Sequence, residues 1–204
     1  MILLATRNQG KLKEYRQILE TLPIKLIGLN DVPTIDKNFD VEETGKSYQE
    51  NAILKATQYG KKANILTIAD DSGLEIDQLK GQLGVYSGRF AQGNFKSARF
   101  KILKYLKNVS KHKRAAKFVC TIALFDPKIK TVKTFTGESH GLITKTEIGN
   151  NGFGYDPIFY SLDLKKTYAE SKDEEKNKVS HRSKAVFKLK KYLQKLNKDE
   201  SKKN

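Results

Sequence analysis

The sequence predicts an α/β protein built on a mixed β-sheet, and two observations carry that prediction. In the N-terminal half, short apolar runs alternate with amphipathic helical stretches, the pattern of strand-helix-strand units. Residues 116–124 instead alternate, Asp126-Pro127 turns the chain and residues 131–140 continue as a second extended run, which together predict a long β-hairpin. Because a hairpin interrupts strictly alternating strands and helices, the sheet is expected to be mixed rather than purely parallel.

Length and composition favour one globular domain, alone or with a minor lobe. The chain has 204 residues, and we expect residues 1–197 to form the domain and residues 198–204 a disordered basic tail. The lone Cys120 lies in an apolar alternating run, so it is expected in the core and excludes a disulfide framework. The apolar start, Met1 to Ala5, is too short for a signal-peptide core or a membrane span. We therefore expect a soluble cytoplasmic protein with no membrane partner.

The formal charge of +16 raises the alternative of a non-catalytic nucleic-acid-binding protein. The kind of basic residue argues against a dedicated nucleic-acid partner. Six of the 39 basic residues are Arg and 33 are Lys, whereas bidentate recognition of phosphates and bases favours Arg. An attraction for a polyanionic small molecule remains compatible with this composition.

The first predicted unit is a strand at 1–5, a polar turn at 6–11 and a helix at about 11–22. Its helix carries an apolar stripe at helical spacing. Free backbone N–H groups at a helix start favour anions. The turn is not a Walker P-loop, because Ala5 and Leu12 stand where that motif needs Gly and Ser or Thr. It is either an anion site or an ordinary strand-to-helix turn.

The second predicted unit is a strand at 24–29 and a helix at about 47–63, with Ser47 and Glu50 as a capping box. Glu42 and Glu43 precede this helix. A third strand, 65–69, then stops at Asp70-Asp71-Ser72-Gly73. This sequence suits a turn, but two adjacent carboxylates repel each other unless a cation lies near them.

Strand-helix-strand units place these polar segments together. Loops that leave strands and enter helices share the sheet edge where the parallel strands end, and ligands of open α/β sheets bind at that edge. The turn at 6–11, the acids at 42 and 43, and Asp70-Asp71 are therefore expected on one edge.

After a short strand at 74–76, a glycine-rich segment at 81–93 predicts a tightly folded or mobile loop, and a helix follows at 94–106. Residues 111–114 form a basic loop in which His112 is expected to be solvated. The hairpin region, 105–145, is our candidate for a second lobe or a dimer contact.

Residues 149–157 combine three glycines with Phe153, Tyr155 and Asp156. Such a loop suits the binding of a flat ring, or is a plain loop whose aromatic residues fill the core. The last predicted element is one helix, 173 to about 195, in which Ser180-His181-Arg182 is expected on the surface.

Six stretches, in this order, resemble the inosine/xanthosine triphosphate pyrophosphatase family and span Thr6 to Arg182. Each motif is weak alone, but six in order are specific. They are Thr6-Arg7-Asn8-Gln9-Gly10-Lys11, Glu42-Glu43-Thr44-Gly45, Glu50-Asn51-Ala52-x-x-Lys55-Ala56, Ala69-Asp70-Asp71-Ser72-Gly73-Leu74, Gly152-Phe153-Gly154-Tyr155-Asp156-Pro157 and Lys176-x-x-x-Ser180-His181-Arg182.

The resemblance implies a twisted mixed sheet flanked by helices, with two lobes and an active-site cleft between them. It implies a homodimeric, Mg²⁺-dependent enzyme that hydrolyses ITP, dITP, XTP and dXTP to the monophosphate and pyrophosphate. A pyrophosphatase of the same fold that acts on modified pyrimidine nucleotides remains an alternative.

The resemblance also assigns roles to residues. Glu42 and Asp71 would hold Mg²⁺, with Asp71 as proton acceptor and Asp70 as a supporting ligand. The purine would stack on Phe153, with Gly154, Tyr155 and Asp156 around it and Lys176, His181 and Arg182 facing its 6-keto oxygen or the phosphates. The phosphates would be bound by Thr6, Asn8, Lys11, Lys55 and Ser72, with Arg7, Gln9 and Gly10 in the same turn.

Overall fold

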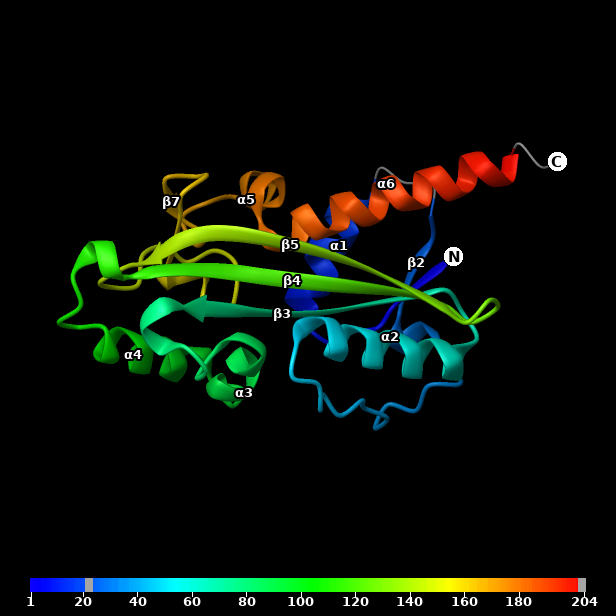
Figure 1. Cartoon of the computed structure of the whole chain (residues 1–204), viewed down its shortest axis with the longest axis horizontal. Helices are drawn as coiled ribbons and strands as arrows, with labels where there is room; N and C mark the ends of the chain where they lie inside the picture. Colours follow the sequence, from blue (N-terminus) through cyan, green and yellow to red (C-terminus); the bar gives the residue numbers. More distant parts are fainter. Residues whose placement is uncertain (21–23, 202–204) are drawn as a thin grey trace. The chain divides into compact units, whose positions relative to one another are not determined.

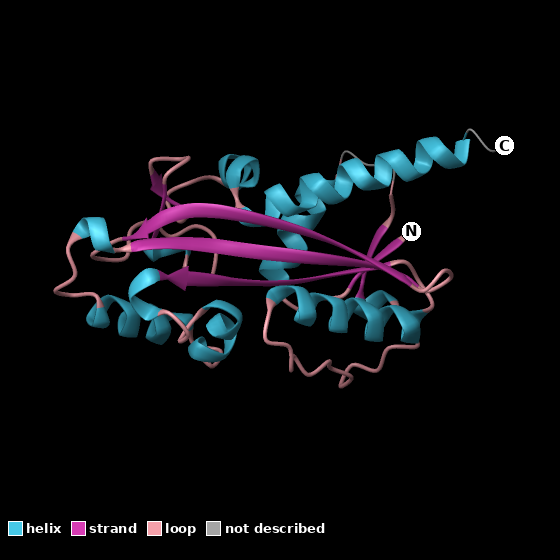
Figure 2. Ribbon diagram, viewed as in Figure 1, coloured by secondary structure: helices cyan, strands magenta, loops and turns pink. Residues whose placement is uncertain are grey.

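A computed structural model describes residues 1–20 and 24–201 of the chain, with side chains up to residue 196. Its described strands form one mixed sheet in the order β2-β1-β3-β4-β5-β6-β7 (Figures 1 and 2). β1 pairs in parallel with β2 and β3, whereas β6 is antiparallel to β5 and β7. The predicted α/β class with a mixed sheet is confirmed. The strands are β1 Ile2–Leu4, β2 Leu26–Gly28, β3 Thr67–Ile76, β4 Ala115–Asp126, β5 Thr131–Ile143, β6 Phe159–Ser161 and β7 Lys166–Thr167.

The described α-helices can be followed by their labels in Figure 1. They are α1 Gln9–Leu19, α2 Tyr48–Ala63, α3 Ser87–Ala91, α4 Phe95–Tyr105, α5 Asp173–Val179 and α6 His181–Ser201. The predicted tail overlaps the end of α6 up to Ser201, and residues 202–204 lie outside the described residues. None of the helices among the described residues is long and apolar enough to cross a membrane.

The chain divides into two compact units. The first comprises residues 1–71, 121–137 and 183–204, and the second comprises residues 72–120 and 138–182. The chain passes between them inside β3, where Asp71 is followed by Ser72. The tip of the predicted hairpin belongs to the first unit, and the other halves of β4 and β5 belong to the second.

In the first unit, α2 packs against the sheet through small residues. Ala52 and Ala56 of α2 are fully buried and share a core cluster with Leu3, Ala69 and Phe125. A Cβ at Gly60 would lie 2.5 Å from Phe125 Cδ1, so the helix approaches β4 closely only with glycine there. In Figure 1, α6 lies on the opposite side of these strands from α2. Helices therefore cover both faces of the sheet in this unit.

In the second unit, the core lies between β3, β4 and the helices that follow them. Leu74 and Ile76 of β3 are buried together with Ile102 of α4, Phe118 of β4 and Phe159 of β6. The rings of Phe118 and Phe159 meet edge to face with centroids 4.6 Å apart. This packing fixes the start of β6, the strand that follows the loop at 149–157.

The prediction of a turn at Asp70-Asp71-Ser72-Gly73 is wrong. These four residues lie in the middle of β3, which runs unbroken from Thr67 to Ile76. Close packing explains the strand: a Cβ at Gly73 would lie 2.1 Å from the carbonyl oxygen of Gly84, so glycine serves a close backbone approach there. Tertiary packing overrides the local turn preference of the sequence.

The single helix expected at 173–195 is also wrong, because the chain forms two helices there. Ser180 separates α5 from α6 with extended backbone angles, φ −66° and ψ 156°. Ser180 is fully buried, and the following His181 is only 4% exposed. The His181-Arg182 pair expected on the surface is therefore buried, and the helix is interrupted directly before it.

The glycine-rich segment at 81–93 is more ordered than a plain loop. It contains the short helix α3 and a 3₁₀ turn at Gly84–Tyr86. Ser87 Oγ donates to the carbonyl oxygen of Gly84 at 2.6 Å and accepts the amide of Leu74 at 2.9 Å. The segment is thus tied to β3.

Arg114 joins three segments of the second unit through main-chain carbonyls. Its side chain is 2% exposed. Nε donates to Ile143 O at 2.7 Å, and Nη1 donates to Leu106 O at 2.6 Å. Nη2 donates to Thr144 O at 2.5 Å. One guanidinium therefore ties the end of α4 to the end of β5.

Replacing Arg114 tests this assignment. We expect Arg114→Met to destabilise the fold by about 3 kcal/mol, because three carbonyls lose a buried donor at about 1 kcal/mol each. Urea unfolding followed by circular dichroism would show a lower midpoint with an unchanged slope. The neighbouring exposed lysine gives the control: Lys113→Met should stay within about 0.5 kcal/mol of the original. Equal midpoints for the two variants would contradict the role of Arg114.

Candidate active site

Two consecutive carboxylates on β3 form the centre of the site in the first unit. Asp70 and Asp71 are only 1% and 5% exposed. Successive strand residues point to opposite faces of a sheet, so the two carboxylates meet different helices. Asp70 forms an ion pair with Lys11 of α1 at 3.0 Å, and Asp71 accepts a hydrogen bond from Asn51 Nδ2 of α2 at 2.9 Å. Each buried carboxylate thus has a polar partner on the helix that covers its face of the sheet.

The turn at 6–11 forms the start of α1. Asn8 caps the helix, because its Oδ1 accepts the Lys11 amide at 3.0 Å, and Thr6 Oγ1 accepts the amide of Asn8 at 3.2 Å. Arg7 turns to the loop at 36–39, where Nη2 donates to the carbonyl oxygens of Asp36 and Phe39 at 3.2 and 3.1 Å. Gln9 and Gly10 are the first residues of the helix. The turn therefore has the backbone form that favours an anion.

On α2, Asn51 and Lys55 lie one helical turn apart and so share a face. Asn51 is fully buried, and its Oδ1 accepts the amide of Gly45 at 2.8 Å. Lys55 forms an ion pair with Glu43 at 2.5 Å. The start of the helix is capped by Ser47 Oγ, which accepts the amide of Glu50 at 3.1 Å. The loop at 42–45 is thus tied to the same helix face that holds Asp71.

The charges around Asp71 act on one another. Burial raises the pKa of Asp71 above its ordinary value, and the charge of Glu43 raises it further, whereas Lys55, Asn51 and Lys11 partly offset these effects. Burial alone would lower the pKa of Lys55, but Asp71, Glu43 and Asp70 outweigh it and raise that pKa. Lys55 therefore stays protonated within a group of three carboxylates.

The three acids expected to bind a metal differ in exposure: Glu42 is exposed, whereas Asp70 and Asp71 are buried. Glu43, next to Glu42, is half-buried and lies against Lys55. Among the described residues, no group of three or more His, Cys, Asp and Glu side chains has the arrangement of a metal site. The candidate metal ligands near Asp71 have carboxylate oxygens, which are the ligands that Mg²⁺ prefers.

In the second unit, the loop at 149–157 is organised by Asp156. Asp156 Oδ2 accepts the amide of Phe153 at 2.9 Å and Lys176 Nζ at 2.7 Å, and both side chains of this ion pair are 4% exposed. A Cβ at Gly152, where φ is +74°, would lie 2.1 Å from Asp156 Oδ2. Only glycine lets the loop close on this carboxylate.

The half-buried ring of Phe153 faces two cations. Lys176 Nζ lies 4.9 Å and Arg182 Cζ 6.0 Å from the ring centroid. Arg182 Nη2 also donates to Ser72 Oγ at 3.0 Å. Because Ser72 directly follows Asp71, Arg182 connects the aromatic loop to the strand that carries the carboxylates.

The other predicted residues of this unit hold the loop in place. His181 stacks on Phe118 with centroids 4.7 Å apart. Tyr155 is buried, and its hydroxyl donates to the carbonyl oxygen of Ser87 at 2.7 Å. Burial raises the pKa of Tyr155 to about 12, against a lowering effect of the Arg99 charge. This tyrosine is a neutral hydrogen-bond donor at physiological pH.

Sequence reasoning did not assign roles to Asn51, Glu43 and Arg99. Arg99 Nη1 donates to Gly154 O at 2.7 Å and so supports the aromatic loop from α4. A signal existed only for Asn51: it lies four residues before Lys55, and this spacing puts both side chains on one helix face. The contacts of Glu43 and Arg99 come from residues distant in sequence.

Several known proteins resemble this chain over most of its length. A dITP/XTP pyrophosphatase from Staphylococcus epidermidis is 45% identical over 194 residues, which are 95% of this chain and 96% of that protein. One from Bacillus anthracis is 42% identical over 195 residues, covering 92% of this chain and 93% of the relative. The solved structure of the Staphylococcus aureus Ham1 protein is 40% identical and superposes with a TM-score of 0.82, over 95% of this chain and 97% of that one.

The family model agrees with these pairwise similarities. It matches residues 2–192, a range that includes both the carboxylates of β3 and the aromatic loop of the second unit. The chain therefore belongs to the Ham1 family.

Proposed function

We propose that this protein hydrolyses deaminated purine nucleoside triphosphates, namely ITP, dITP, XTP and dXTP, to the monophosphate and pyrophosphate. The observation that carries the proposal is the buried carboxylate of Asp71, which Asn51 holds at 2.9 Å while its pKa is raised. Relatives that cover almost the whole chain and are named dITP/XTP pyrophosphatases support it. The activity belongs to the hydrolases that act on acid anhydrides.

On the phosphate side, Asp71 accepts the proton of the water that attacks the α-phosphorus. Burial raises the pKa of its carboxylate, and a higher pKa makes the carboxylate a stronger base. Lys11 and Lys55, together with the capped turn at Thr6 and Asn8, bind the phosphate oxygens and the leaving pyrophosphate.

The chemistry of the donors also fits a divalent cation. Glu42 and Asp71 supply carboxylate oxygens, the ligands that such a cation prefers. Burial and the charge of Glu43 raise the pKa of Asp71, so a cation beside it would stabilise the ionised carboxylate. We propose that Mg²⁺ is held by Glu42 and Asp71. When bound, it neutralises triphosphate charge and polarises the phosphoryl oxygen.

On the base side, the purine stacks on Phe153. Lys176 and Arg182 are donors beside that ring, and Asp156 fixes the direction of the Lys176 ammonium. A donor aimed at the 6-keto oxygen of hypoxanthine or xanthine is left unpaired by adenine, whose 6-amino group is itself a donor. This selects against ATP. We also propose that the enzyme is a cytoplasmic homodimer.

The role of Asp71 as base is tested by Asp71→Asn, which keeps the shape of the side chain. We expect kcat for ITP, measured as pyrophosphate release with Mg²⁺, to fall about a thousandfold, because an amide does not accept the proton. Asp77→Asn makes the same change at an exposed position and should leave kcat unaltered. Full activity in Asp71→Asn would refute the assignment.

Asn51 is proposed as a positioning residue, because its side-chain amide donates to Asp71 at 2.9 Å. Asn51→Asp keeps the size but removes the donor to Asp71, so kcat should fall about 10- to 100-fold and more Mg²⁺ should be needed for half-maximal rate. Gln49→Glu adds the same charge on an exposed position of α2 and is the control. A loss explained entirely by a smaller folded fraction in thermal melts would assign Asn51 a structural role only.

Substrate choice is tested with a panel of ITP, XTP, ATP, dUTP and dTTP at equal Mg²⁺. We expect kcat/KM for ITP and XTP to exceed that for ATP by at least about a hundredfold, because adenine leaves the donor unpaired. Preference for ATP would overturn the proposed selectivity. Preference for dUTP or dTTP would favour the alternative of a pyrimidine nucleotide pyrophosphatase.

A further inference from the structure

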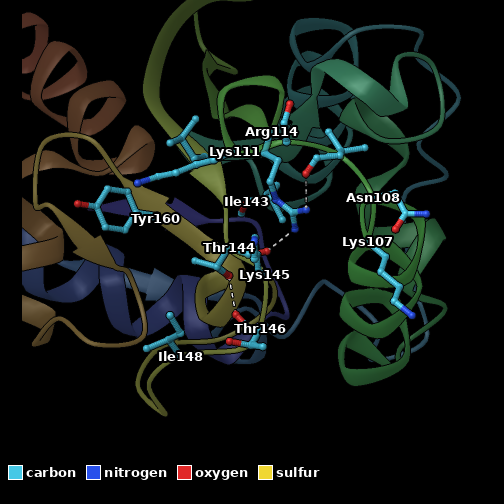
Figure 3. Close-up of a pocket in the computed structure, with 13 residues that line it drawn as sticks. Lys107, Asn108, Lys111, Arg114, Ile143, Thr144, Lys145, Thr146, Ile148 and Tyr160 are labelled. Atoms are coloured by element: carbon cyan, nitrogen blue, oxygen red, sulfur yellow. Dashed lines mark hydrogen bonds between the residues drawn. The ribbon is translucent and has the colours of Figure 1, made fainter.

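A concave site lies within the second unit, and none of the residues assigned to the hydrolytic function lines it. It is a cavity of about 560 Å³. Its walls come from the segment that follows α4 (residues 107–114), the end of β5 and the segment after it (residues 142–148), and Tyr160 of β6 (Figure 3). Its volume falls within the range of about 300–1,000 Å³ that is usual for small-molecule sites.

Hydrogen bonds hold the walls of this cavity in place. The Arg114 guanidinium lies in the wall (Figure 3) and donates to the carbonyl oxygens of Ile143 and Thr144. Nη1 also donates to the carbonyl oxygen of Leu106, which precedes the other wall, and to that of Val109 within that wall at 3.5 Å. Thr144 Oγ1 also donates to Thr146 O at 2.6 Å. The two walls are thus connected without a ligand, so binding would require little ordering of the chain.

The lining combines positive charge with apolar surface. Lys107, Lys111 and Lys145 are exposed lining residues, and the charged Arg114 lies in the wall. No Asp or Glu belongs to the lining residues within the described part of the chain. Apolar contact area comes from Ile143 and Ile148 and from the ring of Tyr160. The cavity therefore attracts anions through its positive charges and offers apolar surface for the uncharged part of the same ligand.

We propose that this cavity binds a small organic anion that carries one charged group, carboxylate, sulfonate or phosphate ester, on an apolar or aromatic body. The lysines attract the charged group, and Ile143, Ile148 and Tyr160 take up the body. Inorganic phosphate would lack the apolar contacts, and a neutral aromatic molecule would lack the attraction to the lysines. The proposal is independent of the hydrolytic function, because it involves none of the residues assigned to that function.

The test uses the full chain and the probe 8-anilinonaphthalene-1-sulfonate, an aromatic sulfonate whose fluorescence rises on binding to apolar surface. We expect saturable binding of one probe per chain. The double variant Lys111→Glu/Lys145→Glu should weaken that binding at least about tenfold, because two attractive charges become repulsive. Lys96→Glu/Lys101→Glu changes the net charge equally at exposed positions of α4 outside the cavity and should bind as the original does.

Competition identifies the ligand class. Phenyl phosphate and phenylacetate should displace the probe, whereas benzyl alcohol and inorganic phosphate at the same concentration should not. Absence of saturable binding, or equal affinities in the two double variants, would overturn the proposal. Pyrophosphate release from ITP should be unchanged in both double variants, so a failure of the proposed function is distinguishable from a failure of this inference.

Discussion

The burial of two adjacent carboxylates on β3 is the constraint on which the first unit depends. A charge that leaves water needs a partner, and uncompensated burial is strongly destabilising. Asp70 obtains Lys11 from α1, and Asp71 obtains Asn51 and the field of Lys55 from α2. Because consecutive strand residues face opposite sides, the two acids find their partners on two different helices. The strand and both helices are therefore linked by the compensation of these buried charges.

The partners of Asp71 do not fully offset the cost of burying its charge. Burial is the largest effect and raises its pKa, and the charge of Glu43 adds to this, although Lys55, Asn51 and Lys11 act in the other direction. Strain of this kind is typical of functional sites, where binding of a charged ligand relieves it. A purely structural ion pair would be expected to lower the pKa of its carboxylate. The balance of charges around Asp71 thus distinguishes a proposed base from a structural acid.

Sequence patterns predicted most elements because those elements are amphipathic. The stripe of α2, its cap at Ser47 and the hairpin of β4 and β5 follow from periodicity and local chemistry alone. The turn predicted at Asp70-Asp71-Ser72-Gly73 is wrong because the turn preference of these residues is local. The strand found there depends on the close approach of Gly84 to Gly73, which comes from residues farther along the chain. The contacts of the site were predictable only where spacing carried them, as for Asn51 and Lys55. Arg99 reaches Gly154 from 55 residues away, and no local pattern reports such a contact.

The break between α5 and α6 determines which side chains meet at the aromatic loop of the second unit. In a continuous helix, Lys176 and Arg182 would be six residues apart, hence about 240° apart around the axis at 3.6 residues per turn. They would then point to different faces, and one ring would not meet both cations. The extended backbone of Ser180 changes the direction of the chain between them.

With that break, Lys176 bonds Asp156, Arg182 bonds Ser72, and both lie within about 6 Å of the Phe153 ring centroid. A ring flanked in this way presents its free area and two fixed donors to the same ligand. The buried serine between the helices is therefore a requirement of the proposed purine site, and not a local irregularity of the fold.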